Sequence, residues 1–321
     1  MKKQLIALLG LSLLLSACSK PTTATIMEFE FESIATNSDD NLGDFTILDA
    51  LAKDIAIVQD ESAYVDDNIT SNSALIIDDT NREVIFSKNA NARIYPASVT
   101  KIMTAYLAFK YCNLDDVVTI TDESIITDAG SKLCYISPGD KLTVRQLING
   151  TLIYSGNDCA AALGVHISGS LTDFVELMNN EAYALGAVNT HFVNPHGLHN
   201  ENHYTTAYDL YLIFNKLIEY DEAKTIVNTP SYTTTYTLAD GSPKEATWNT
   251  TNKYLSGEYT IPSGINIVGG KTGFTDEAGY NLILLSNDES GKQYISVVIG
   301  NPDYYTLYTN MSNLLRKVTN N

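Results

Sequence analysis

The chain has 321 residues, with 20 lysines and arginines against 38 aspartates and glutamates, which gives a formal net charge of −18. A nucleic-acid-binding protein needs a basic face to neutralise phosphates, so this balance excludes a nucleic-acid partner. A hydrophobic content of 44% suffices for a sizeable core and excludes wholesale disorder. Four cysteines are too few for a disulfide scaffold in a chain of this length.

Residues 1–17 are predicted to be an export signal. Two lysines after Met1 are followed by an apolar stretch from Leu5 to Leu15, which is shorter than the ~20 residues of a membrane-spanning helix. A Leu-Ser-Ala-Cys sequence then ends at Cys18 and resembles the lipobox of bacterial lipoproteins, which implies a diacylglycerol on this cysteine. Two acyl chains anchor a protein stably. We therefore expect an extracytoplasmic protein that is lipid-anchored to the bacterial cell membrane; the alternative is an ordinary signal peptide with an incidental cysteine.

Residues 18–67 are predicted to be an acidic tether. Residues 26–67 hold 12 acidic side chains and one basic one, Lys53. Like charges extend such a segment and repel anionic lipid, so the tether would hold the following domain away from the membrane. Ordinary solubility is the simpler explanation of this charge. Apolar residues recur at helical spacing around residues 44–58, which indicates one short helix within the tether.

Regular structure is expected to begin at Ser73, with a hairpin over residues 74–86. Strands at both ends of this region with helices between them imply one sheet assembled from distant segments. The predicted helices cover residues 98–111, 143–154, 157–168, 171–185, 206–220 and 303–318. The further predicted strands cover residues 231–238, 244–250, 265–275, 280–286 and 293–300.

The first motif that indicates chemistry is Ser98-x-x-Lys101, at the start of a predicted helix. Residues i and i+3 share a helix face, so a hydroxyl and an amine lie side by side. A serine becomes a nucleophile when a base takes its proton, and a partly buried lysine with a lowered pKa can be that base. Alone this motif is weak, because a capping serine beside a solvated lysine is common.

The second motif is Ser155-Gly156-Asn157, in the turn between two predicted helices. It offers a hydroxyl and a carboxamide two residues apart, separated by a permissive glycine. A plain turn between helices would use the same residue types.

The third motif is Lys271-Thr272-Gly273, on the predicted strand 265–275. Glycines weaken a strand, and those at 269, 270 and 273 often mark a close backbone approach to a ligand. The alternative is a glycine-rich bulge that carries a surface lysine.

The order Ser-x-x-Lys, Ser-x-Asn, Lys-Thr-Gly resembles the signature of penicillin-binding proteins and serine β-lactamases. The sequences around the motifs, at residues 95–104, 155–158, 194–198 and 270–282, are more specific. They are similar to those of low-molecular-mass D-alanyl-D-alanine carboxypeptidases, serine peptidase family S11. The resemblance implies a catalytic domain over residues 68–321 with a β-lactamase/transpeptidase-like α/β (α+β) fold. In this fold an antiparallel sheet of about five strands is flanked by helices, with an added helical subdomain.

The resemblance also implies catalytic roles. Ser98 would attack the carbonyl of the terminal D-Ala–D-Ala bond in a peptidoglycan stem peptide, and Lys101 would accept its proton. Ser155 would relay a proton to the leaving D-alanine amine. No metal or cofactor is required, and β-lactam antibiotics would acylate Ser98 as covalent inhibitors.

The binding roles follow from the same resemblance. Asn157 would position the base and the substrate amide. Lys271 and Thr272 would bind the terminal carboxylate of the substrate, beside Gly273. The backbone N–H of Phe274 and that of the nucleophile would form the oxyanion hole.

Three alternatives stay open at this stage. A DD-endopeptidase that cuts peptidoglycan cross-links would carry the same three motifs. A class A β-lactamase is disfavoured, because the chain has no Glu-x-x-Leu-Asn between the second and third motifs. A non-catalytic lipoprotein that binds wall peptides is disfavoured by the intact reactive residues.

The remaining histidines and cysteines are given structural roles. We expect His196 to orient its loop, and His191, His199 and His203 to lie at the surface or in loops. Cys159 is expected to be a small core residue. Cys112, Cys134 and Cys159 permit at most one disulfide, and their spacing resembles no zinc site.

Overall fold

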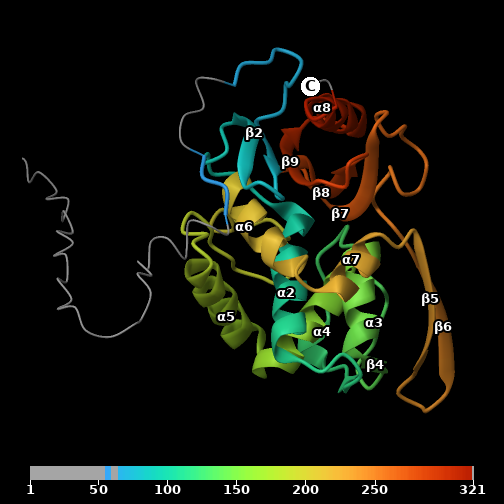
Figure 1. The fold of residues 1–321 in the computed structure, drawn as a ribbon. Helices are drawn as coiled ribbons and strands as arrows, with labels where there is room; N and C mark the ends of the chain where they lie inside the picture. The colour runs from blue at the N-terminus through green and yellow to red at the C-terminus, as the bar shows by residue number, and fades with distance from the viewer. Residues whose placement is uncertain (1–54, 59–63, 320–321) are drawn as a thin grey trace, which may run out of the picture. The chain divides into compact units, whose positions relative to one another are not determined.

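The computed structural model describes residues 55–58 and 64–319 (Figure 1). The predicted signal, Cys18 and most of the predicted tether lie outside the described residues. Of the predicted tether helix, residues 55–58 are described, and they are not helical. Among the helices of the described part, none has the length and apolar character that a membrane span requires.

The core of the fold is a five-stranded antiparallel sheet that joins the two ends of the described chain (Figure 1). Its N-terminal hairpin lies beside three strands from the C-terminal end, because β1 pairs with β9. The prediction of a sheet assembled from distant segments is thereby confirmed. In spatial order its strands are β2 (Glu83–Lys88), β1 (Ser73–Asp78), β9 (Gln293–Asn301), β8 (Gly279–Asp288) and β7 (Ile265–Thr275).

Both faces of this sheet are buried, and alternate residues of one strand serve opposite faces. Ile76 packs with the C-terminal helix α8 (Tyr304–Arg316) in one apolar cluster. Leu75 and Ile77 belong to the main core, which contains the central helix α2 (Lys101–Tyr111). Residues 101–108 of α2 are all buried, so neighbours surround this helix on every side.

The remaining helices pack around α2 and form the helical part of the molecule (Figure 1). The predicted helices 157–168, 171–185 and 206–220 correspond closely to α4, α5 and α6. The segment α7 was not expected. These helices are α3 (Val144–Asn149), α4 (Asn157–Ser168), α5 (Leu171–Ala184), α6 (Ala207–Leu217) and α7 (Asp221–Val227).

The expectation of a single sheet was wrong for the hairpin of β5 (Ser231–Thr237) and β6 (Pro243–Asn249), which belongs to a second, four-stranded sheet. Its other strands are the short segments β3 (Val117–Thr119) and β4 (Lys141–Thr143). Strand β5 is rich in threonine, and most of its side chains are exposed or half-buried. Such a strand cannot replace one that is buried on both faces.

The predicted helix 143–154 is interrupted at its end. Helix α3 ends at Asn149 and is followed by a π-helical turn over Gly150–Tyr154. This turn leaves Ser155 in the left-handed region with φ of 73°. π-turns and strained backbone concentrate at functional sites because they aim particular side chains.

The loop 194–198 packs against the 3-10 turn over Ala97–Thr100, which carries Ser98 and is here called the nucleophile turn. Gly197 has φ of +88°, and a Cβ on this residue would lie 1.9 Å from the carbonyl oxygen of Ala97. Only glycine permits so close a backbone contact. Ala97 directly precedes Ser98, so this contact fixes the chain where the first motif begins.

We expect Gly197→Ala to lower the free energy of unfolding by well over 1 kcal/mol, and to slow reactions at Ser98. Gly169→Ala is the matched control, because Gly169 has φ of +82° and open space around the position of a Cβ. It should cost only about 1 kcal/mol, from backbone strain alone. Urea unfolding of both variants checks this, and equal losses of stability would contradict the argument.

Candidate active site

The first motif forms one hydrogen-bonded unit. Ser98 is half-buried in a 3-10 turn over Ala97–Thr100, and Lys101 begins α2 directly after it. Nζ of Lys101 lies 2.9 Å from Oγ of Ser98. The predicted pairing of a hydroxyl and an amine on one helical face is therefore observed, and the hydroxyl remains reachable from solvent.

Lys101 is fully buried, and its amine has three oxygen neighbours. Besides Ser98 these are Oδ1 of Asn157 at 2.7 Å and the carbonyl oxygen of His196 at 2.7 Å. A neutral amine has two N–H donors and one lone pair. It can therefore donate to Asn157 and His196 while it accepts the hydroxyl proton of Ser98. The geometry suits a lysine that acts as a base.

Burial lowers the pKa of Lys101 to about 7, and the nearby Asp158 carboxylate opposes that shift. The physical cause is the loss of hydration of the charged form. Near neutral pH a large share of Lys101 is then uncharged, as a general base requires.

The second and third motifs meet through another buried lysine. Nζ of Lys271 donates to Oγ of Ser155 at 2.9 Å and to the carbonyl oxygen of Thr272 at 2.8 Å. Burial, followed by repulsion from Lys101, lowers the pKa of Lys271 well below its usual value. The hydroxyl of Ser155 in the second motif is thus hydrogen-bonded to the amine of Lys271 in the third motif, although the two residues are 116 positions apart in the sequence.

Strand β7 carries the third motif at the edge of the five-stranded sheet. Gly273 lies against the nucleophile turn, and a Cβ there would approach Pro96 O, Ser98 N and Val99 N to within 2.9–3.0 Å. The glycine predicted to mark a close approach therefore marks the approach of β7 to the first motif. Thr272 Oγ1 is 2.5 Å from Oγ1 of Thr251.

These residues surround a cavity of about 250 Å³ between β7, the second motif and the loop 197–198. The predicted Ser98, Ser155 and Asn157 line it, with residues 272–274 along β7. The buried amines of the two lysines lie behind this lining. Phe274 has 45% of its surface exposed, and its ring lies 4.2 Å from that of Tyr280 between centroids.

Several residues of the cavity were not predicted. Lys132 places its amine 4.4 Å from the ring centroid of Tyr154, and Tyr304 comes from the start of α8. Thr251 follows the hairpin strand β6 and belongs to a Thr-Thr-Asn run, which in the sequence could equally be an ordinary polar loop. Nothing in the sequence around Lys132 distinguishes it from a surface lysine. The unpredicted residues that line the cavity include Gly130, Ser131, Lys132, Leu198, Thr251 and Tyr304.

The histidines largely follow the prediction. His203 lies in a loop, as one of the two expected placements, but it is buried, with Nε2 2.8 Å from Oγ1 of Thr100. Its two ring nitrogens bridge the nucleophile turn and the backbone N–H of Val193, which explains its burial. His196 is buried in its own loop and offers its carbonyl oxygen to Lys101. Burial lowers the pKa of each imidazole to about 3, so both stay neutral.

Among the described residues, Cys134, Asp158 and Cys159 are buried together, and their potential ligand atoms lie within 4.8 Å of one another. The Asp158 carboxylate accepts backbone N–H groups from Cys134, Ile136 and Cys159. Burial raises the pKa of the Cys159 thiol well above its usual value. The cluster thus ties residues 134–136 to the start of α4, directly behind Asn157. Cys159 is a core residue as predicted, and Cys112, Cys134 and Cys159 are free thiols.

Comparison with known proteins matches residues 59–303 to the D-alanyl-D-alanine carboxypeptidase family of S11 peptidases. The chain is 35% identical over 235 residues to D-alanyl-D-alanine carboxypeptidase DacF of Bacillus subtilis, with 71% of this chain and 57% of that protein covered. It is 36% identical over 242 residues to DacA of Escherichia coli, with 72% and 56% covered. The chain thus spans little more than half the length of these curated relatives.

The fold has solved counterparts. The crystal structure of the Streptomyces K15 DD-transpeptidase superposes with a TM-score of 0.72 at 29% identity, covering 78% of this chain and 97% of that one. D-alanyl-D-alanine carboxypeptidase DacD from Francisella tularensis superposes with a TM-score of 0.69 at 28% identity, covering 86% and 76%. The predicted penicillin-binding protein fold is confirmed. With three motifs converging on one cavity and a family match over most of its length, the chain belongs to the S11 family of D-alanyl-D-alanine carboxypeptidases.

Proposed function

We propose that this protein is a serine carboxypeptidase that removes the terminal D-alanine from peptidoglycan stem peptides through an acyl-enzyme on Ser98. The observation that carries the proposal is the contact between the Ser98 hydroxyl and the buried amine of Lys101, whose pKa is lowered to about 7. A lysine with a purely structural role requires neither a lowered pKa nor contact with a solvent-accessible serine hydroxyl. The combination of both features therefore favours a catalytic role.

The first step forms a bond between Oγ of Ser98 and the carbonyl carbon of the penultimate D-alanine. The hydroxyl proton passes to Nζ of Lys101, which retains its contacts with Asn157 and the His196 carbonyl. Negative charge then develops on the substrate oxygen. The backbone N–H groups of Ser98 and Phe274 stabilise it.

The second step breaks the peptide bond. The hydroxyl of Ser155, which Lys271 holds at 2.9 Å, relays to the leaving D-alanine nitrogen the proton that Lys101 took in the first step, so Lys101 becomes neutral again. Water then attacks the ester on Ser98, and Lys101 takes a proton from this water and returns it to Oγ of Ser98 as the shortened peptide leaves. A β-lactam ring presents a comparable carbonyl, and its opening leaves Ser98 acylated.

Binding of the substrate uses the edge of β7. Lys271 and Thr272 hold the terminal carboxylate, and Thr251 supplies a further hydroxyl 2.5 Å from that of Thr272. Because β7 is the edge strand of its sheet, its backbone is open to an extended peptide, which pairs with it as an added strand. Asn157 contacts the substrate amide from the opposite wall.

The same proposal assigns the protein to the outer side of the membrane. Residues 1–17 act as an export signal, and the diacylglycerol on Cys18 anchors the mature chain. The acidic segment up to residue 67 serves as its spacer. The supporting observations are the lipobox sequence and the 12 acidic residues of this segment.

The catalytic proposal is tested with a pentapeptide ending in D-Ala-D-Ala and with cross-linked peptide dimers. We expect free D-alanine from the pentapeptide and a penicillin adduct on Ser98. Ser98→Ala should lower D-alanine release by at least about a thousandfold, because no other group replaces the nucleophile. Ser290→Ala, in the exposed turn between β8 and β9, is the control and should retain full activity.

Other outcomes decide between the alternatives. Release of monomers from dimers without free D-alanine would instead identify a DD-endopeptidase. The absence of any product together with no penicillin adduct would leave only a wall-binding protein, and the catalytic proposal would be wrong.

The anchoring proposal is tested with Cys18→Ala in a bacterial host supplied with radioactive palmitate. The unaltered chain should carry label and sediment with membranes, whereas the variant should lose the label and the membrane association. Cys112→Ala is the control and should behave as the unaltered chain. Unlabelled protein, or equal sedimentation of the variant, would refute the anchor.

A further inference from the structure

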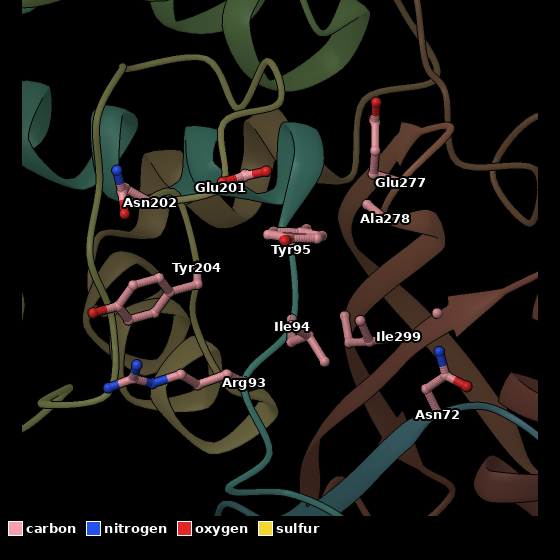
Figure 2. Close-up of a pocket in the computed structure, with 11 residues that line it drawn as sticks. Asn72, Arg93, Ile94, Tyr95, Glu201, Asn202, Tyr204, Glu277, Ala278 and Ile299 are labelled. Carbon is pink, nitrogen blue, oxygen red and sulfur yellow. The ribbon is translucent and has the colours of Figure 1, made fainter.

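A second cavity, of about 480 Å³, lies beyond the end of β7 (Figure 2). Its lining comes from the start of β1, residues 93–95, the loop 201–204, the turn after β7 and the end of β9. Figure 2 shows Tyr95 near the middle, Glu201 and Glu277 on either side above it, and Arg93 and Tyr204 below. None of these residues takes part in the reaction proposed above.

The second cavity adjoins the catalytic one. Tyr95 lines it and lies three residues before Ser98. Tyr95 also lines a small hollow together with Leu198 and Thr275, and these two residues line the catalytic cavity as well. His199 lies beside Tyr95 at this boundary. Its ring packs edge-on against that of Tyr95 with 4.7 Å between the centroids, and its Nδ1 is 3.8 Å from a carboxylate oxygen of Glu277.

When the substrate peptide is bound along β7, its N-terminal end points toward this cavity. In the proposed function, on which this inference rests, the carboxylate end binds at Thr272. The peptide then follows β7 past Thr275 toward Glu277. Five extended residues span roughly 17 Å, and Glu277 follows Thr272 by five positions, in the turn after β7. The sugar that carries a five-residue stem peptide would therefore arrive where the second cavity opens.

The lining has the chemistry of a saccharide site. The carboxylates of Glu201 and Glu277 accept hydrogen bonds, and Arg93 donates them, with its guanidinium held 4.3 Å from the ring centroid of Tyr204. The carboxamides of Asn72 and Asn202 do both. The hydroxyl and acetamido groups of a sugar can pair with this mixture of hydrogen-bond donors and acceptors. Two carboxylates beside one guanidinium would repel a phosphate. The volume lies within the ~300–1,000 Å³ of small-molecule sites.

We propose that this cavity binds the N-acetylated amino sugar to which the stem peptide is joined. The enzyme would then recognise its substrate at two places, the D-alanine carboxylate at Thr272 and the sugar beside Arg93. The second contact would favour peptides still attached to the glycan over free peptides.

The test compares two substrates of the full mature chain: a free pentapeptide ending in D-Ala-D-Ala and the same peptide carried on its disaccharide. The variant is Arg93→Ala combined with Glu201→Ala, both exposed residues. We expect kcat/KM for the disaccharide peptide to fall about tenfold, which corresponds to one or two lost hydrogen bonds. The value for the free peptide should stay within about twofold of that of the unaltered chain.

A matched control removes the same residue types elsewhere. Arg316→Ala with Glu289→Ala alters a separate hollow near the C-terminus and should change neither value. Equal effects of the Arg93 variant on both substrates, or no effect on either, would overturn the sugar site while the proposed activity stands. An unaltered chain that cleaves neither substrate would overturn the proposed function and this inference with it.

Discussion

The site depends on one electrostatic constraint, the burial of two lysine amines behind a single small cavity. Lys101 and Lys271 are both fully buried, and each would repel the other if both were charged. Desolvation makes the charged pair costly, so the pKa of each amine is lowered. A neutral Lys101 no longer repels Lys271, which removes one of the causes that lower the pKa of Lys271. In the proposed function, this environment would supply Ser98 with a base, and an arriving substrate carboxylate would favour the charged form of Lys271.

The rest of the fold holds those amines in place. The π-helical turn after α3 leaves Ser155 with φ of 73°, and the loop that follows α5 lays Gly197 against Ala97, itself at φ of 49°. Gly273 lets the edge strand approach the nucleophile turn. Strained backbone thus occurs where segments distant in the sequence come into contact. The packing of the five-stranded sheet and the buried helix α2 holds these residues in their strained conformations.

The sequence predicted which residues come together at the candidate site better than it predicted the arrangement of the strands. The three motifs are local patterns with fixed spacing, so Ser98, Lys101, Ser155 and Lys271 could be singled out as candidates without a structure. The second sheet could not, because three-residue strands such as Val117–Thr119 carry almost no periodic signal. Cavity residues such as Lys132 and Thr251, and the buried His203, depend on tertiary contacts that no local pattern encodes.

The pKa of Lys101 tests the central claim most directly. It can be measured by titrating protein labelled with ¹³C at the lysine Cε positions, with the Lys101 resonance assigned by its loss in Lys101→Arg. The account predicts a transition at about pH 7, with the protonated form below it and the neutral base above it. A transition near the usual value of 10.5, with Lys101 still charged at neutral pH, would contradict the account, because Ser98 would then have no base.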